Sequence, residues 1–176
     1  MSTKRIVMLS VLMALGIVLN AMENVFLPWT ILPIPGARIG LANIVFLMML
    51  LLENFKLTLT LSVLRIFILG ALTGTIATPV FPLSLGGAVL SLLLMKIARL
   101  ALGDKLSLIG LSIIGAVGHN LGQLVVLSML PGLFPGFTAL YLLLPGLLLM
   151  AIPAGMITGW VVERIFPTIA REWRNR

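Results

Sequence analysis

Three polar side chains, His119, Asn120 and Gln123, interrupt the long apolar stretch 107–130. Polar groups in a membrane span are costly and usually face the bundle interior or a water-filled cavity. Together, a His, an Asn and a Gln supply donors and acceptors for a polar solute. Alternatively, the pattern Gly118-x-x-x-Gly122 lets two helices approach closely, with Asn120 and Gln123 bonding across the contact. The cluster as a whole favours solute binding.

A second polar set lies near the end of the apolar stretch 6–25, where Asn20 and Glu23 share one helical face. The segment that follows brings Arg38 to the start of the next apolar stretch, and Asn43 lies one turn deeper. A helix N-terminus and an Arg guanidinium together can hold a carboxylate or phosphate. The alternative is an ion pair between Arg38 and Glu23 that closes this end of the bundle.

Arg65 lies in the middle of the apolar stretch 57–72. An unpaired charge at that depth costs several kcal/mol. We therefore expect Arg65 to pair with an interior partner, such as Glu23 or the carbonyls of a helix end, rather than with substrate.

The chain offers no persuasive catalytic set. It has no Cys and one His, and only five acidic residues, of which Asp104 is the single Asp. Magnesium-dependent diphosphate chemistry needs clustered carboxylates, and transition metals need several His or Cys ligands. No G-x-x-x-x-G-K-[ST] loop is present for ATP. We expect no catalytic residue, no metal and no cofactor, and therefore a binding or transport component instead of an enzyme.

The elements that position these residues follow from composition. Hydrophobic residues make up 60% of the 176 residues and charged ones only 10%, which excludes an ordinary soluble domain of this size. A helix needs about 20 mostly apolar residues to cross the hydrocarbon. We predict one all-α membrane domain with six transmembrane helices, the second and third forming a tight hairpin, at residues 6–25, 39–52, 57–72, 85–102, 107–130 and 137–165.

Charge predicts the orientation. Only Arg38 would lie outside if the N-terminus is cytoplasmic, and Arg65 lies within a span. The remaining ten of the 12 Lys and Arg residues then lie inside: Lys4, Arg5, Lys56, Lys96, Arg99, Lys105, Arg164, Arg171, Arg174 and Arg176. This distribution predicts a multi-pass protein of the cell membrane with both termini cytoplasmic. Because the basic residues orient helices and form no single patch, we expect no nucleic acid partner.

Two seams of small residues predict close helix contacts. Ser10 and Ala14 lie four residues apart on the first helix, and Ala151, Gly155 and Gly159 repeat that spacing on the sixth. Pro145 and Pro153 predict kinks in the sixth helix. One of the two seams is a candidate for contact with a partner subunit.

Two motifs carry a resemblance to a known family: Pro-Gly-Ala-Arg38-Ile-Gly-Leu-Ala-Asn43 and Gly-Ala-Val-Gly-His119-Asn120-Leu-Gly-Gln123. With six short helices, they resemble the Gx transporter family, whose members carry the label heptaprenyl diphosphate synthase component I. That family is similar to the substrate-binding S components of energy-coupling factor (ECF) transporters. The resemblance implies an S-component-like bundle with an outer pocket, and implies that Ser10 and Ala14 match the motif that docks the first helix on a partner.

Two functions follow as hypotheses. The leading one is the substrate-binding subunit of an ATP-driven ECF importer for a small vitamin-like or precursor solute. Its partners would be a shared transmembrane energising subunit and two ATPase subunits. The alternative is a membrane anchor, component I, for a soluble heptaprenyl or polyprenyl diphosphate synthase of isoprenoid quinone biosynthesis. In that case the segment Lys96–Lys105 and the basic tail would form the docking surface.

Overall fold

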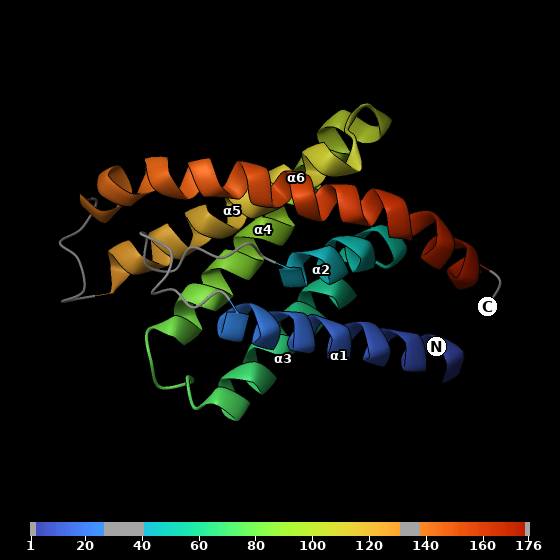
Figure 1. Cartoon of the computed structure of the whole chain (residues 1–176), viewed down its shortest axis with the longest axis horizontal. Coiled ribbons are helices and arrows are strands. Elements are labelled where there is room, and N and C mark those ends of the chain that lie inside the picture. The colour runs from blue at the N-terminus through green and yellow to red at the C-terminus, as the bar shows by residue number, and fades with distance from the viewer. Residues whose placement is uncertain (1–2, 27–40, 131–137, 175–176) are drawn as a thin grey trace.

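The computed structural model describes residues 3–26, 41–130 and 138–174, and every regular element in these ranges is helical (Figure 1). Five of the helices are long and apolar enough to cross a membrane. The chain is therefore an all-α, multi-pass membrane protein, as predicted. The elements are α1 (Thr3–Phe26), α2 (Leu41–Leu52), α3 (Phe55–Thr73), α4 (Val80–Leu102), the short 3-10 helix η1 (Gly103–Lys105), α5 (Leu108–Met129) and α6 (Thr138–Arg174).

Helix α2 forms the centre of the bundle. It has 12 residues, and at a rise of about 1.5 Å per residue it is about 18 Å long, well short of the roughly 30 Å of hydrocarbon. Ala42 and every residue of 44–50 are buried. The helix contacts α1, α3, α5 and α6. The second predicted span thus corresponds to the short helix α2, which protein encloses on most of its surface, and this explains why it is apolar on nearly all sides.

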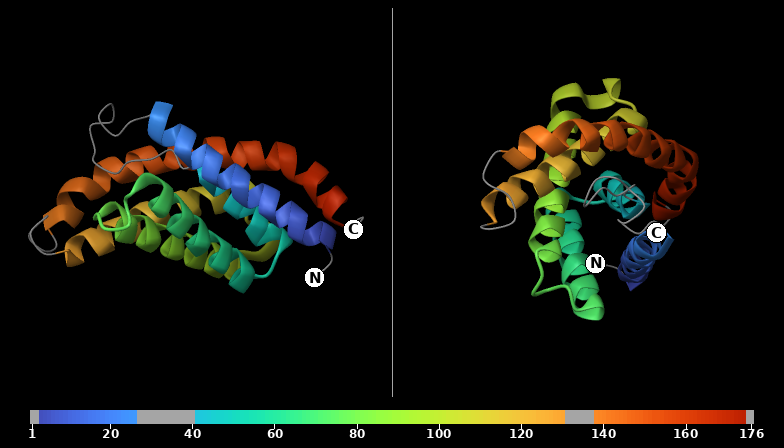
Figure 2. Two further views of the ribbon diagram at one scale, coloured as in Figure 1. Left: turned by 90° about the horizontal axis from the view of Figure 1, so that it is seen from below. Right: turned by 60° about the vertical axis from the view of Figure 1, so that its left-hand side comes forward.

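The polypeptide alternates in direction from one helix to the next. The start of α1, the α2–α3 turn, the α4–α5 turn and the end of α6 consequently lie toward one end of the molecule, where both termini are found (Figures 1 and 2). This arrangement agrees with the predicted up-and-down order of six helices. The cytoplasmic location of that end remains a prediction from charge.

Helices α3 and α5 each begin at a side-chain cap in the short turn that precedes them. The Asn54 side chain accepts a hydrogen bond from Leu57 N at 2.9 Å and begins α3, and Ser107 Oγ accepts one from Gly110 N at 3.0 Å and begins α5. Helix α3 ends at Gly74, whose φ of 68° is the left-handed conformation that glycine adopts at low cost. The predicted tight hairpin between α2 and α3 is confirmed.

Close backbone contacts join α4, α5 and α6. A Cβ atom added to Gly122 of α5 would lie 2.7 Å from the carbonyl carbon of Gly86 in α4. On α6, a Cβ at Gly155 would lie 2.6 Å from Ile113 Cα in α5, and a Cβ at Gly159 would meet the same helix. The predicted small-residue seam of the sixth helix therefore packs inside the chain, against α5.

Helices α4 and α6 extend beyond their predicted bounds, through segments that contain proline. Helix α4 begins at Val80 rather than 85, and Pro82 lies in its first turn, where no backbone N–H is needed. Helix α6 continues to Arg174 rather than ending at 165, with Pro145, Pro153 and Pro167 inside it. Figure 1 shows α6 as one continuous, curved helix.

The glycine contact between α4 and α5 gives a stability prediction. Gly122→Ala places a methyl group against the backbone of α4, which cannot yield, so we expect a loss of about 1–3 kcal/mol. The matched control is Gly110→Ala in the same helix, where the nearest atom is the flexible end of Leu106. Alanine favours helix there by about 1 kcal/mol. Thermal unfolding in detergent should show a lower midpoint only for Gly122→Ala; equal losses in both variants would contradict the tight contact.

Candidate functional site

Glu23 links the end of α1 to the beginning of α2. The residue is 3% exposed, and its Oε2 accepts a hydrogen bond from Leu41 N at 3.2 Å. The first N–H groups of a helix lack intrahelical partners and carry a partial positive charge, so a carboxylate is well placed there. Arg38, the predicted partner of Glu23 or of an anionic solute, lies outside the described residues.

Arg65 is buried among α1, α2 and α3. It is 4% exposed, and its guanidinium carbon lies 4.6 Å from the centre of the Phe46 ring in α2. Gly16 of α1 approaches the same ring, since a Cβ added there would lie 3.3 Å from Phe46 Cε2. A cation over an aromatic face is stabilised electrostatically when it is desolvated. Arg65 is therefore in the interior, as predicted, and its pairing with Glu23 or with the carbonyls of a helix end remains a prediction.

These residues belong to one layer of helices. Asn20 lies one turn after Gly16 and is 7% exposed, while Asn43 lies about one turn before Phe46 and is half-buried. We refer to Asn20, Glu23, Asn43 and Arg65 as the polar column. Because α1 packs on both α2 and α3, the polar column runs between these helices toward the N-terminus of α2.

The polar residues of α5 connect that helix to α6. Asn120, 4% exposed, donates from Nδ2 to the Leu147 carbonyl at 2.9 Å. About two turns before Asn120 in α5, the Ser112 hydroxyl lies 2.6 Å from that of Thr158 in α6. Gln123 is also buried, at 8% exposure. The Asn120 contact joins two helices, as the packing alternative expected, but it is made to α6, whereas Gly118 and Gly122 approach α4. Binding of a solute by Asn120 or Gln123 remains a prediction.

His119 faces α4 rather than α6. Its imidazole ring lies against Gly87, where an added Cβ would be 2.8 Å from His119 Cε1. The side chain is half-buried. Gly87 thus leaves the space that the ring fills, and a role of His119 in binding remains a prediction.

The structure assigns the predicted binding residues to two different helix groups. Asn20, Glu23 and Asn43 come from α1 and α2, whereas His119, Asn120 and Gln123 come from α5, which packs on α4 and α6. Helix α2 contacts both α1 and α5. The first group therefore lies on α1 and α2, and the second lies on α5, which α2 also contacts.

Ser10 and Ala14 lie on the exposed face of α1. Ser10 Oγ donates to the Ile6 carbonyl of its own helix at 3.0 Å, so the hydroxyl is satisfied without a second helix. Val7, Val11 and Val18 flank the pair and are 56%, 61% and 52% exposed. The face is accessible to lipid or to another helix, and docking of a partner there remains a prediction.

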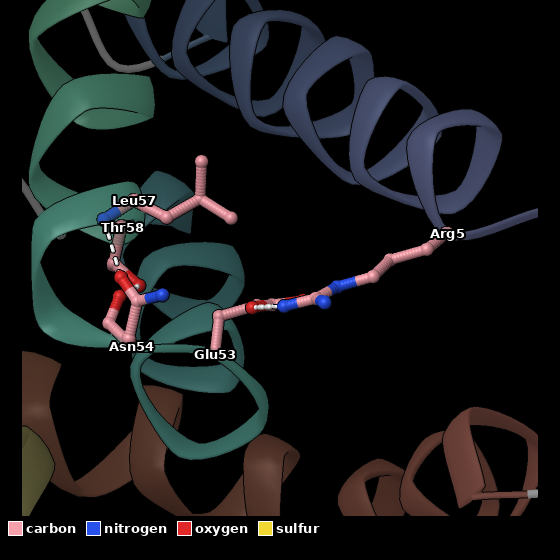
Figure 3. A network of polar contacts seen from close by, with 5 residues as sticks. All are labelled: Arg5, Glu53, Asn54, Leu57 and Thr58. Atoms are coloured by element: carbon pink, nitrogen blue, oxygen red, sulfur yellow. Dashed lines mark hydrogen bonds and ion pairs between the residues drawn. The ribbon is translucent and has the colours of Figure 1, made fainter. Parts of the chain in front are cut away.

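At its N-terminal end, α1 is joined to the α2–α3 turn by a bidentate ion pair that the sequence did not indicate. Arg5 Nε donates to Glu53 Oε1 at 2.6 Å, and a second guanidinium nitrogen pairs with Oε2 (Figure 3). The Arg5 side chain is 39% exposed and that of Glu53 is 1% exposed. The two residues are 48 positions apart, so local spacing could not predict that they pair. The one indication in the sequence was a carboxylate, Glu53, among turns that are otherwise strongly basic.

Basic residues gather at this end of the molecule, which we call the basic end. Lys96 Nζ lies 4.7 Å from the Phe55 ring centre, and an Arg99 guanidinium nitrogen donates to the Leu50 carbonyl at 3.1 Å. Other members are exposed to solvent: Lys4, Lys56, Lys105, Arg164, Arg171 and Arg174.

The ion pair predicts an asymmetric mutational effect. Arg5→Ala should lower the melting temperature more than Glu53→Ala, because it leaves a carboxylate buried without its cation, whereas Arg5 is exposed enough to become hydrated. The double variant should be more stable than Arg5→Ala alone. Lys4→Ala, an exposed neighbour, is the control. Thermal unfolding of the four variants in one detergent checks this, and equal midpoints for Arg5→Ala and Lys4→Ala would contradict it.

Comparison with known proteins adds one clear relationship. No curated protein and no solved structure matches the chain. Among the described residues, no group of three or more His, Cys, Asp or Glu side chains is placed to hold a metal ion. A protein-family model does match, over residues 12–165, which include most of the helical bundle. The chain belongs to the heptaprenyl diphosphate synthase component I family.

Proposed function

We propose that the chain is the membrane component of a heptaprenyl diphosphate synthase and holds a separate, soluble catalytic subunit at the bilayer. The family description supports this, because a component I implies an enzyme with at least one further component. The product would serve isoprenoid quinone biosynthesis. The chain itself would contribute a surface and a membrane location and would perform no chemical step.

The distribution of carboxylates supports a non-catalytic role. Prenyl-chain elongation releases diphosphate, and enzymes hold that group through metal ions bound to clustered carboxylates. This chain has five acidic residues. Two of them serve the fold, since Glu23 accepts from the N-terminus of α2 and Glu53 pairs with Arg5. The chemistry would therefore belong to the partner.

A membrane component has a physical purpose for this reaction. Each methylene group transferred from water to an apolar environment gains about 0.8 kcal/mol, so a growing prenyl chain becomes strongly lipophilic. A catalytic subunit held against the bilayer can release its product directly into lipid. The observation that carries the proposal is the basic end, which offers exposed charge at one end of a bundle whose sides are apolar.

This proposal is tested by recruitment. Purified catalytic component of heptaprenyl diphosphate synthase should sediment with neutral phosphatidylcholine vesicles that contain this chain, and stay in solution with empty vesicles. Because the Debye length falls from about 10 Å at 0.1 M salt to about 3 Å at 1 M, binding to a charged surface should weaken as salt rises. Sedimentation no better than with empty vesicles, at low salt, would overturn the proposed function.

A second candidate function is the substrate-binding subunit of an ECF-type importer, with an energising membrane subunit and two ATPases as partners. The specific observation in its favour is the polar column, in which Asn20, Glu23 and Arg65 are buried inside a membrane bundle. Such residues often mark a solute site. The solute would be a small vitamin-like or precursor molecule with an anionic group near Arg38, and ATP would be used by the other chains.

Retention of a small molecule tests the second candidate. Native mass spectrometry of gently purified protein should show an added mass that Asn43→Ala loses, because loss of one polar contact to a charged ligand weakens binding by about ten- to a hundredfold. Asn54→Ala is the matched control, since Asn54 caps α3 at the opposite end of α2. A parent protein without any added mass, or equal retention in all three proteins, would count against the importer.

A further inference from the structure

Helix α6 is longer than a membrane crossing requires. No charged residue occurs from Thr138 to Val162, a length of about 37 Å for a helix, against about 30 Å of hydrocarbon. Glu163 and Arg164 are the first charges, and the helix then continues to Arg174. We call residues 163–174 the α6 extension. Figures 1 and 2 show that the C-terminal end of α6, together with the start of α1, reaches beyond the ends of the other helices.

One face of this extension is fixed to the bundle. Val162 is fully buried, and Phe166, Ile169 and Trp173 pack against the same hydrophobic core. Their spacing of four, three and four residues places them on one side of a helix. The extension is therefore held in a defined orientation by apolar contacts with the rest of the chain.

The opposite face is basic and exposed. Arg164, Thr168 and Arg171 follow at intervals of four and three residues, and Arg174 lies one turn further. At about 100° per residue, these positions centre roughly opposite the buried face. We call Arg164, Thr168, Arg171 and Arg174 the α6 outer stripe. Packing of the inner face thus fixes where the outer stripe points.

The outer stripe differs from three basic residues of the basic end whose side chains are engaged within the fold. Arg5 pairs with Glu53, Lys96 lies over Phe55, and Arg99 donates to the Leu50 carbonyl. Those three side chains hold helices together. Arg171 and Arg174 are solvent-exposed on a protruding helix, where guanidinium groups can pair bidentately with carboxylates.

The position of the outer stripe along α6 favours a soluble protein over lipid headgroups. Trp160 is 54% exposed and Arg164 lies 5.5 Å over its ring, a combination typical of the membrane interface. Arg171 and Arg174 lie about 10 and 15 Å further along the helix axis than Arg164. The headgroup layer of one leaflet is only about 5–7 Å thick.

We propose that the α6 outer stripe is the surface that binds an acidic patch on the soluble catalytic subunit, with Arg171 and Arg174 as its central contacts. This inference rests on the proposed function and narrows the docking surface to one helix face. Lys96 and Arg99 are not part of this docking surface: they lie in the segment 96–105 that was predicted to dock the partner, but their side chains contact other parts of the fold.

Charge reversal tests the proposal. Arg171→Glu with Arg174→Glu should weaken sedimentation of the purified catalytic component with neutral phosphatidylcholine vesicles by about tenfold or more, since two charged contacts are lost and replaced by repulsion. The matched control, Lys56→Glu with Lys105→Glu, changes net charge equally at exposed positions of the same end. The control should stay within about threefold of the parent, as expected for charges outside a contact.

The outcomes separate this inference from the proposed function. If the parent chain fails to recruit the catalytic component, both the proposed function and the α6 docking surface are wrong. A parent that recruits it equally well with and without the Arg171 and Arg174 reversals leaves the function standing and overturns the α6 surface. Equal weakening by both double variants overturns it in favour of diffuse attraction. An effect confined to vesicles containing phosphatidylglycerol assigns the stripe to lipid and overturns it as well.

Photocrosslinking supplies a measurement that does not depend on altered charge. A benzoyl-phenylalanine at Thr168, in the middle of the outer stripe, should crosslink to the catalytic component. The same group at Ala77, exposed in the turn between α3 and α4 at the other end of the bundle, should not. Crosslinks from Ala77 and none from Thr168 would place the partner elsewhere.

Discussion

The bilayer supplies neither hydrogen bonds nor counter-ions, and this constraint organises the whole molecule. Each buried polar group described here that has an assigned contact finds it on another helix or at a helix end. Glu23 accepts from the first N–H of α2, Arg65 lies over Phe46, Asn120 donates to a carbonyl of α6, and Ser112 meets Thr158. Because these contacts join different helices, the polar residues fix the relative positions of helices that apolar packing alone would leave free to slide.

The two ends of the bundle differ in how their polar side chains are exposed. Near the N-terminus of α2, the Glu23 carboxylate and the Asn20 amide are buried, which suits either tight packing or recognition of a small solute. At the basic end, charges are numerous and many are exposed, which suits a partner that arrives from water. Membership of the heptaprenyl diphosphate synthase component I family favours the second use. The Arg5–Glu53 pair belongs to that end as well and anchors the start of α1 there.

Hydropathy and residue spacing were sufficient to predict those features of the structure that depend on a pattern within one helix. The six helices, the α2–α3 hairpin and the close packing of Gly155 and Gly159 all follow from such patterns. Contacts between distant segments did not follow: Arg5 and Glu53 are separated by 48 residues, and nothing local marks them as partners. The predicted bounds of α4 and α6 were too short, because Pro82 costs little in a first turn and the packing of Phe166, Ile169 and Trp173 extends α6 past Pro167.

The rigid attachment of the α6 extension bears on how a membrane component can recruit a soluble enzyme. A basic tail without fixed structure must lose conformational freedom when it binds, at about 0.5–1.5 kcal/mol for each long side chain and more for the backbone. Here the inner face of α6, from Val162 to Trp173, is already packed against the core. The backbone cost is met during folding, so binding need only order the arginine side chains. A surface prepared in this way also holds its partner at one distance and orientation from the bilayer, which a flexible tail cannot do.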